Sequence, residues 1–461
     1  MASPFFDSPT EILRLILGRL SSSDLRNVCL VNRDLRSIAE TFLYCKIQWI
    51  WEETHTPSVG CFLRSILARP QLATFVQTVI LEGDTFERNM YQFRRESPKL
   101  QVSETELDKL IKCIKNINLP YSSLWIQELR HGTMDAFVAL MLSQLPNLKQ
   151  LHLGKNFTRE NRILGMMLRS TLCGEQELTN VPLPSFEHLR DVSTVSFPLG
   201  IDIRRHTDAR STEDILPFFY LPSVKHITAS IDNPVSFSWP APHPPNPRRL
   251  ESLDLTMIRE GHLGNVLCVA KGLRKLRWAW YYRPDLEDRF VTDNIDLGQI
   301  AADLSHVRNT LTDLTISAGA DMAQADPEFP PLYIKGPFRA FSNLNTLRKL
   351  EVPLPLLVGF SPHGVHARRL EESLPRSIEY LTITDNLCFQ SEWEWRDVDL
   401  LEALRLWLLD WKKPTPRLRG FHLLLKVIDY GEWGPAMRQQ LLELGAQVGI
   451  QVNITKIAGN M

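Results

Sequence analysis

The sequence has few features of a secreted, membrane-spanning or metal-binding protein. Its seven cysteines are scattered over 461 residues without a C-x-x-C pair, which fits neither a disulfide framework nor a zinc cluster. The first twenty residues lack a basic segment, and Glu11, Arg14 and Arg19 interrupt their apolar positions, which argues against a signal peptide. No run of about 18 uncharged apolar residues occurs. We therefore expect a cytoplasmic and/or nuclear chain with reduced cysteines.

The chain also lacks an excess of charge of either sign. It carries 52 lysines and arginines against 53 aspartates and glutamates, a net charge of −1. Nucleic acids and membrane surfaces attract proteins with a large basic excess, so neither partner is expected. The hydrophobic fraction of 44% is ordinary for a packed protein. At roughly 100–200 residues per domain, the length allows several domains, or a small module followed by a long repeat array.

The familiar catalytic motifs are absent as well. The sequence contains no P-loop, no G-x-G-x-x-G, no G-x-S-x-G and no H-E-x-x-H. Asp397 and Asp399 form an acidic pair, but they begin an apolar, helix-like stretch, where the helix dipole favours acids. We therefore expect no catalytic residue, no metal site and no cofactor.

The clearest pattern lies in the first fifty residues. Pro9 suits the first turn of a helix, because the amide that proline lacks has no partner there. Apolar residues from Ile12 to Leu20 then repeat on one helical face. The serines at 21–23 end that helix and offer a cap for a second one, and a third amphipathic pattern follows Asn32. Helices this short bury little surface alone, so they need a neighbour, either the rest of the chain or a partner.

This segment resembles the F-box, a three-helix module that combines Leu-Pro, an acidic residue, an Ile/Leu-rich helix, Asp-Leu and a Val-Cys-type turn. The residues that match are Pro9, Glu11, Ile12-Leu13, Ile16-Leu17, Leu20, Asp24-Leu25 and Leu30-Val31. Ser8 stands where the family usually has Leu, and Leu35 stands where many members carry Trp. A helical cap on a larger fold is the alternative interpretation.

The resemblance implies that residues 1–48 dock on the adaptor Skp1 and, through Skp1, join a cullin–RING core. Apolar side chains that three helices cannot hide would be covered by that partner. The residues expected to contact Skp1 are Pro9, Ile12, Leu13, Ile16, Leu17, Leu20, Leu25, Val28, Leu30 and Val31.

Residues 49–461 contain a recurring strand pattern, with apolar residues at i, i+3 and i+5 after a helical stretch and a turn. This L-x-x-L-x-L pattern is typical of leucine-rich repeats, which build the concave side of a solenoid. The centres of the later strands are separated by 23 to 40 residues, so the repeats are degenerate. The windows are Val76/Val79/Leu81, Leu148/Leu151/Leu153, Val224/Ile227/Ala229, Leu250/Leu253/Leu255, Leu273/Leu276/Trp278, Leu311/Leu314/Ile316, Leu347/Leu350/Val352, Ile378/Leu381/Ile383 and Leu418/Phe421/Leu423.

We therefore predict an α/β repeat protein, in which a three-helix F-box precedes an irregular leucine-rich-repeat solenoid with a parallel sheet on its concave side. The rival is a conventional α/β domain, which also alternates helices and strands. Residues 233–247 are proline-rich and predict a loop projecting between repeats, and residues 318–337 predict a second solvated loop. Residues 437–454 predict a closing helix and strand.

One aromatic cluster is a candidate substrate-binding site. Aromatic side chains at strand ends usually pack in the core or at its rim, but on a concave repeat surface they also anchor partners. Basic residues alternate with this cluster and would face a substrate. The candidates are Arg274, Arg277, Trp278, Trp280, Tyr281 and Tyr282.

The sequence thus predicts a non-catalytic substrate-recognition subunit of a Skp1–cullin–F-box ubiquitin ligase, with an unidentified protein substrate on the repeat domain. One alternative is a scaffold that binds Skp1 without ubiquitin transfer, which the absence of cullin from the complex would indicate. Another is an α/β enzyme with an unrecognised site, which a deep pocket with convergent carboxylates or histidines would favour.

Overall fold

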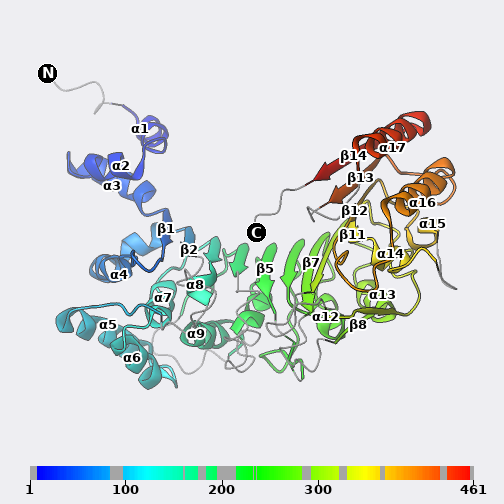
Figure 1. Cartoon of the computed structure of the whole chain (residues 1–461). Coiled ribbons are helices and arrows are strands. Elements are labelled where there is room, and N and C mark those ends of the chain that lie inside the picture. Colours follow the sequence, from blue (N-terminus) through cyan, green and yellow to red (C-terminus); the bar gives the residue numbers. More distant parts are fainter. Residues whose placement is uncertain are drawn as a thin grey trace. The chain divides into compact units, whose positions relative to one another are not determined.

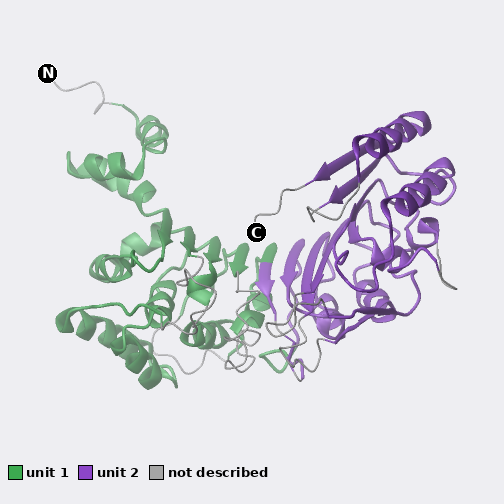
Figure 2. Ribbon diagram, in the orientation of Figure 1, with its two compact units in different colours: residues 1–203, 213–227, 239–243 green, residues 204–212, 228–238, 244–461 purple. Residues whose placement is uncertain are grey.

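The computed structural model describes residues 8–83, 97–158, 161–174, 183–194, 214–231, 233–234, 236–282, 292–320, 330–363, 369–425 and 433–456. The chain divides into two compact units (Figure 2). Unit 1 comprises residues 1–203, 213–227 and 239–243, and unit 2 comprises residues 204–212, 228–238 and 244–461. Among the described residues, no helix is long and apolar enough to cross a membrane.

Helices occur throughout both units (Figure 1). Those of unit 1 are α1 (Thr10–Leu17), α2 (Ser22–Val28), α3 (Arg33–Leu43), α4 (Val59–Ala68), α5 (Glu104–Ile117), α6 (Ser122–Arg130), α7 (Met134–Leu142), α8 (Lys155–Thr158), α9 (Arg162–Leu172) and the 3-10 helices η1 (Pro70–Phe75) and η3 (Leu216–Tyr220). Those of unit 2 are α12 (Glu260–Leu267), α13 (Leu297–Ser305), α14 (Pro355–Val358), α15 (Leu370–Ser373), α16 (Asp397–Leu409) and α17 (Pro435–Val448).

Twelve strands form one large parallel sheet, and their order in the sheet is their order along the chain. They are β1 (Lys46–Ile50), β2 (Thr78–Glu82), β3 (Gln150–Leu153), β4 (Asp191–Thr194), β5 (His226–Ser230), β6 (Ser252–Thr256), β7 (Lys275–Tyr282), β9 (Asp313–Ala320), β11 (Lys349–Pro353), β12 (Tyr380–Thr384), β13 (Gly420–Leu425) and β14 (Gln451–Lys456). A separate pair consists of β8 (Asn294–Asp296) and β10 (Tyr333–Lys335). A doubly wound α/β sheet reverses its strand order, so this sequential order is compatible with a repeat solenoid instead.

The predicted windows locate nine of these strands. In every window the three apolar side chains are buried, and the most exposed of them, Leu418, is 3% exposed. The alternating polar residues lie on the opposite side of each strand, as a period of two requires. The predicted closing helix and strand are confirmed as α17 and β14. The apolar pattern did not predict strand β4, because Thr194 occupies the position where the pattern requires a third apolar residue.

Successive repeats of unit 2 stack in the same register. The Thr346 hydroxyl donates to the carbonyl oxygen of Leu311 (2.8 Å), and the Ser377 hydroxyl donates to that of Leu347 (2.7 Å). Each hydroxyl precedes the first apolar residue of its own window and bonds the first apolar residue of the window before. The same hydrogen bond therefore repeats from β9 to β12, which supports the interpretation of these segments as equivalent units.

Three boundaries differ from the prediction. The helical module ends at Leu43, because residues 46–48 belong to β1, which pairs with β2. The proline-rich insertion has no helix or strand in its described residues, but it does not project freely. Its Trp239 packs against Phe219 with 5.4 Å between ring centroids. In the second predicted loop, residues 333–335 form β10, and residues 321–329 lie outside the described part.

Candidate interaction surfaces

Local capping defines the three N-terminal helices. Pro9 stands directly before α1, and the Ser21 hydroxyl caps α2 by accepting a hydrogen bond from the Asp24 amide (3.2 Å). The Asn32 side chain caps α3 by accepting from the Leu35 amide (2.8 Å). Such caps satisfy amides that the first helical turn leaves without partners. The serine cap expected from the sequence is confirmed.

The core of the three helices is small. Leu17, Leu25 and Ala39 are its buried centre. Partly buried residues pack around them, namely Leu20, Val28, Cys29, Ile38, Phe42 and Leu43. A core of this size leaves other apolar residues of the helices without cover.

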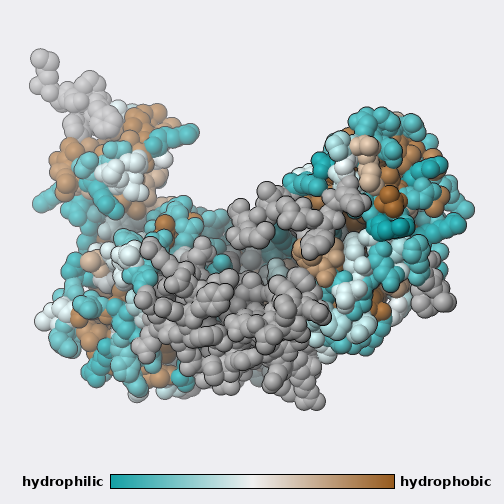
Figure 3. Space-filling view, in the orientation of Figure 1, coloured by the Kyte–Doolittle hydropathy of each residue, from teal (hydrophilic) through white to brown (hydrophobic). Residues whose placement is uncertain are grey.

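Those uncovered residues are exposed apolar side chains on α1 and on the turn after α2. We define the apolar helix surface as Ile12, Leu15, Ile16, Leu30 and Val31, which are 46%, 69%, 41%, 85% and 60% exposed. Figure 3 shows hydrophobic residues gathered over these helices at the upper left. Several large exposed apolar side chains on so small a module are typical of a protein–protein contact.

The structure separates the ten predicted Skp1 contacts into three groups. Ile12, Ile16, Leu30, Val31 and Pro9 are exposed, whereas Leu20 and Val28 are half-buried against the core. For Leu13, Leu17 and Leu25 the expectation of an exposed contact is corrected: they are 7%, 1% and 5% exposed, and Leu17 and Leu25 belong to the module core. Leu15 was missed, although it lies on the side of α1 away from the buried Leu13 and Leu17, as a helical period of 3.6 predicts.

A partly buried ion pair joins α3 to the following segment. Glu40, which is 6% exposed, accepts hydrogen bonds from Arg69 at the start of η1 (2.8 Å) and from Arg36 one helical turn earlier (2.8 Å). The hydrogen bond from Arg69, opposed by burial, holds the pKa of Glu40 below its ordinary value. These hydrogen bonds join α3 to η1 within unit 1.

The second candidate surface is the open face of the unit 2 sheet, formed by side chains that alternate with the buried windows. It is polar: Arg277 lies 3.9 Å from Asp254 on β6, and Lys349 lies 3.9 Å from Asp313 on β9. Burial raises the pKa of Asp254, while Arg277 opposes that shift. The mixed charges suit a polar, exchangeable partner more than a permanent apolar one.

The predicted aromatic cluster divides between the two faces of β7. Trp278 and Trp280 are fully buried, and the indole N–H of Trp278 donates to the Ile258 carbonyl oxygen (2.7 Å). The expectation that they contact a substrate is therefore corrected: they share the inward face with Leu276 because strand side chains alternate. Tyr281 lies on the open face, where a Cβ on Gly319 of β9 would approach its ring to 2.7 Å. Tyr282 is half-buried, and burial raises its pKa.

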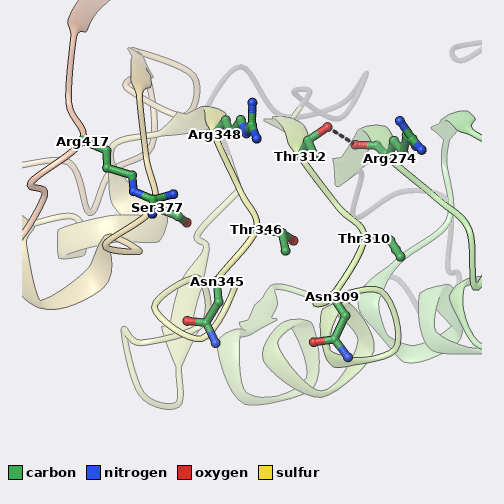
Figure 4. Close-up of a pocket in the computed structure, with 9 residues that line it drawn as sticks. All are labelled: Arg274, Asn309, Thr310, Thr312, Asn345, Thr346, Arg348, Ser377 and Arg417. Atoms are coloured by element: carbon green, nitrogen blue, oxygen red, sulfur yellow. Dashed lines mark hydrogen bonds between the residues drawn. The ribbon is translucent and has the colours of Figure 1, made fainter.

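The remaining candidate, Arg274, lines a groove at the amino ends of the unit 2 strands. The groove has a volume of about 360 Å³. We call it the amino-edge groove; Figure 4 shows its lining, which comprises Arg274, Asn309, Thr310, Thr312, Asn345, Thr346, Arg348, Ser377 and Arg417. Each of these residues precedes a strand, so the groove crosses several repeats.

A larger cavity of about 530 Å³ lies at the carboxyl ends of β12, β13 and β14. Trp393, Trp395 and Trp433 contribute to its wall, together with the carboxylates of Asp385 and Asp397. Its remaining apolar lining is Leu354, Ile383, Val398, Leu400, Leu423 and Leu425. The acidic pair Asp397 and Asp399 does not act as a unit, because Asp399 is bonded to Arg396 (2.8 Å).

A buried charged network stands behind β7. Arg259 is 1% exposed, pairs with Glu260 (2.8 Å) and lies 4.5 Å above the ring of Trp280. Asp303 of α13 is 3% exposed, and burial raises its pKa to about 7. Its Oδ1 accepts from the Gln299 side chain (2.7 Å), while its buried Oδ2 makes no hydrogen bond in the described part of the chain. Sequence patterns gave no signal for this network.

Neither a family model nor a curated protein matches this chain. Within the described residues, no group of three or more histidine, cysteine, aspartate or glutamate side chains could hold a metal ion.

Proposed function

We propose that this chain is a substrate-recognition subunit of a Skp1–cullin–F-box ubiquitin ligase. In this proposal α1–α3 act as the F-box that binds Skp1, and unit 2 presents a protein substrate on its degenerate leucine-rich repeats. The chain performs no chemistry itself; it brings a substrate lysine close to a charged ubiquitin carrier, and proximity supplies the rate enhancement.

The apolar helix surface carries the proposal. Leu30 and Val31 are 85% and 60% exposed, side by side, in the turn that follows α2. Fully covering a Leu, Ile or Val side chain contributes about 1.5–3 kcal/mol, so a partner that covers several of these residues gains enough for a stable complex. The F-box resemblance supplies the identity of that partner.

The experiment is co-expression with Skp1 followed by size-exclusion chromatography. The test variant is Leu30→Asp with Val31→Asp, because both residues are exposed and the substitutions leave the module core intact. The matched control is Leu406→Asp with Leu409→Asp, two exposed leucines on α16 of unit 2, at 60% and 58% exposure. Substitutions at Leu13 or Leu17 would not serve, since both residues are buried in the module.

The proposal predicts a one-to-one complex with Skp1 for the wild type and the control variant, and none for the test variant. A soluble, monodisperse wild-type chain that elutes apart from Skp1 would contradict it. Equal loss of Skp1 by the test and control variants would also contradict it, because the contact would then lie elsewhere.

A catalytic role is the second candidate function, and the carboxyl-end cavity is the observation that favours it. Asp385 and Asp397 line this cavity together with tryptophan side chains and with Arg396 and Lys456. Cavities of about 300–1,000 Å³ are typical of small-molecule sites. Binding of a small-molecule library member that Asp385→Asn abolishes would favour an enzyme, whereas a cullin-containing complex would favour the receptor.

A further inference from the structure

We propose that the amino-edge groove binds an extended acidic peptide segment, phosphorylated or carboxylate-rich, of the protein substrate. This inference rests on the proposed receptor function and specifies the substrate chemistry that unit 2 recognises.

The charge of the lining is the first argument. Arg274, Arg348 and Arg417 line the groove, and no aspartate or glutamate does. Within the described residues, Arg274 and Arg417 have no ion-pair partner, and Arg348 shares Glu379 with Arg419 at 3.8 and 3.7 Å. Since the whole chain carries a net charge of −1, this uncompensated positive charge is local. Arginine forks bind carboxylates and phosphates through paired charge-assisted hydrogen bonds.

The neutral side chains of the groove are the second argument. Its hydroxyls already have acceptors in the protein: the Thr312 hydroxyl lies 2.6 Å from a carboxylate oxygen of Asp313 and 3.0 Å from the Arg274 carbonyl oxygen, and Thr346 and Ser377 donate to backbone carbonyl oxygens of the preceding repeat. Asn309 and Asn345, by contrast, occupy equivalent positions in adjacent repeats and make no side-chain hydrogen bond to the described part of the chain. Figure 4 shows the two amides on parallel turns. They are free to bond the carbonyl and amide groups of a peptide backbone.

The spacing of the arginines is the third argument. The Thr312 amide bonds the Arg274 carbonyl oxygen (2.8 Å) and the Arg348 amide bonds that of Thr312 (2.8 Å), so Arg274 and Arg348 are two strands apart. At about 4.8 Å per strand, their backbones are roughly 10 Å apart. An extended peptide advances about 3.1–3.3 Å per residue, so anionic groups three residues apart match this separation. The volume of about 360 Å³ admits a short segment rather than a folded domain.

The test is fluorescence anisotropy with the full chain and four labelled probes. Three are ten-residue peptides of one sequence that carry two phosphoserines three residues apart, two glutamates at the same positions, or two unmodified serines. The fourth is a single-stranded oligonucleotide. The groove variant is Arg274→Ala, Arg348→Ala, Arg417→Ala. Its control, with the same change of net charge, is Lys335→Ala, Arg369→Ala, Arg405→Ala, three exposed cations outside the lining.

We expect the phosphorylated peptide to bind at least about tenfold more tightly than the unmodified one, with the glutamate peptide between them. The groove variant should lose this preference, and the control should stay within about twofold of the wild type. Equal binding of phosphorylated and unmodified peptides, or equal affinity of the groove and control variants, overturns the inference. So does tighter binding of the oligonucleotide with the same dependence on the arginines.

Skp1 binding, measured on the same samples, separates this inference from the proposed function. A wild-type chain that binds Skp1 but shows no preference for the acidic peptides overturns the groove inference alone. A chain that binds the phosphorylated peptide through the arginines but ignores Skp1 overturns the receptor proposal and leaves the groove intact.

Discussion

The apolar helix surface and the amino-edge groove expose side chains of opposite chemistry to solvent. The helices of residues 10–43 expose leucine, isoleucine and valine side chains over a core centred on three buried residues. The groove of unit 2 instead exposes arginine and asparagine beside strands whose inward apolar window residues are buried. An exposed apolar cluster fits a long-lived partner, whereas exposed unpaired charge fits an exchangeable one. In the proposed function, the first region binds the adaptor and the second binds the substrate.

The largest expected effect tests the small core of the helical module. Leu17→Ala removes a 1% exposed side chain and should destabilise α1–α3 by about 2–5 kcal/mol, whereas Leu30→Ala removes an 85% exposed one and should change stability by less than about 0.5 kcal/mol. Hydrogen exchange of the α1–α3 amides measures both. If both substitutions accelerated hydrogen exchange of the α1–α3 amides to a similar extent, Leu30 would contribute to the stability of the module and would not be free to contact a partner.

The next largest effect concerns the buried network behind the unit 2 sheet. Burial raises the pKa of Asp303 to about 7, above its value in the unfolded chain. The folded protein therefore favours the neutral carboxyl, and its contribution to the free energy of unfolding is fully present below about pH 4 and is lost as the pH rises through 7. Asp303→Asn keeps an acceptor for Gln299 and should stabilise unit 2 at pH 8 by roughly 1–3 kcal/mol. Urea melts at pH 5 and pH 8 measure this. An unchanged pH dependence would mean that Asp303 is ionised without penalty.

A smaller effect probes how the helical module is attached. Arg69→Ala leaves the buried Glu40 with Arg36 alone and should destabilise the junction by about 1–2 kcal/mol. Because the pKa of Glu40 is lowered in the fold, the contribution is present above the unfolded pKa and lost as the pH falls through the folded one. Exchange of the α3 amides at pH 7 and pH 4 should therefore differ less in the variant than in the wild type. Identical differences would place the attachment elsewhere.

The smallest effect compares the two regions directly. Raising salt from 50 to 500 mM should lower the affinity for the phosphorylated peptide by about fivefold or more, because salt screens exposed charges. The affinity for Skp1 should change by less than about twofold. Titrations at both salt concentrations give the two ratios. Equal sensitivity would show that the two surfaces do not differ in kind.

Much of the sheet was predictable, because each strand repeats the same short pattern. Leu311, Leu314 and Ile316 specify β9 by themselves, and the inward direction of Trp278 and Trp280 follows from Leu276 by alternation. The candidate substrate residues follow the aromatic content of the segment, which does not distinguish the two faces of a strand. The alternation does distinguish them: Arg277 and Tyr281 face outward, whereas Trp278 and Trp280 face inward.

The groove was not predictable, since it depends on which strands become neighbours. Asn309 and Asn345 are 36 residues apart in sequence and become adjacent only when β9 pairs with β11. The Asp303 network likewise joins α12 and α13 through buried polar groups that leave no periodic signal. Local patterns therefore specify the elements, while the sites between repeats depend on stacking.

The most direct test of the receptor account is assembly with purified Skp1 and a cullin–RING core, followed by analytical ultracentrifugation. The account predicts one stable species that contains this chain, Skp1, the cullin and the RING subunit, and that dissociates when Leu30 and Val31 are both changed to Asp. A chain that sediments alone in the presence of all three partners would contradict the account. A complex with Skp1 that excludes the cullin would contradict its ligase role and favour a scaffold.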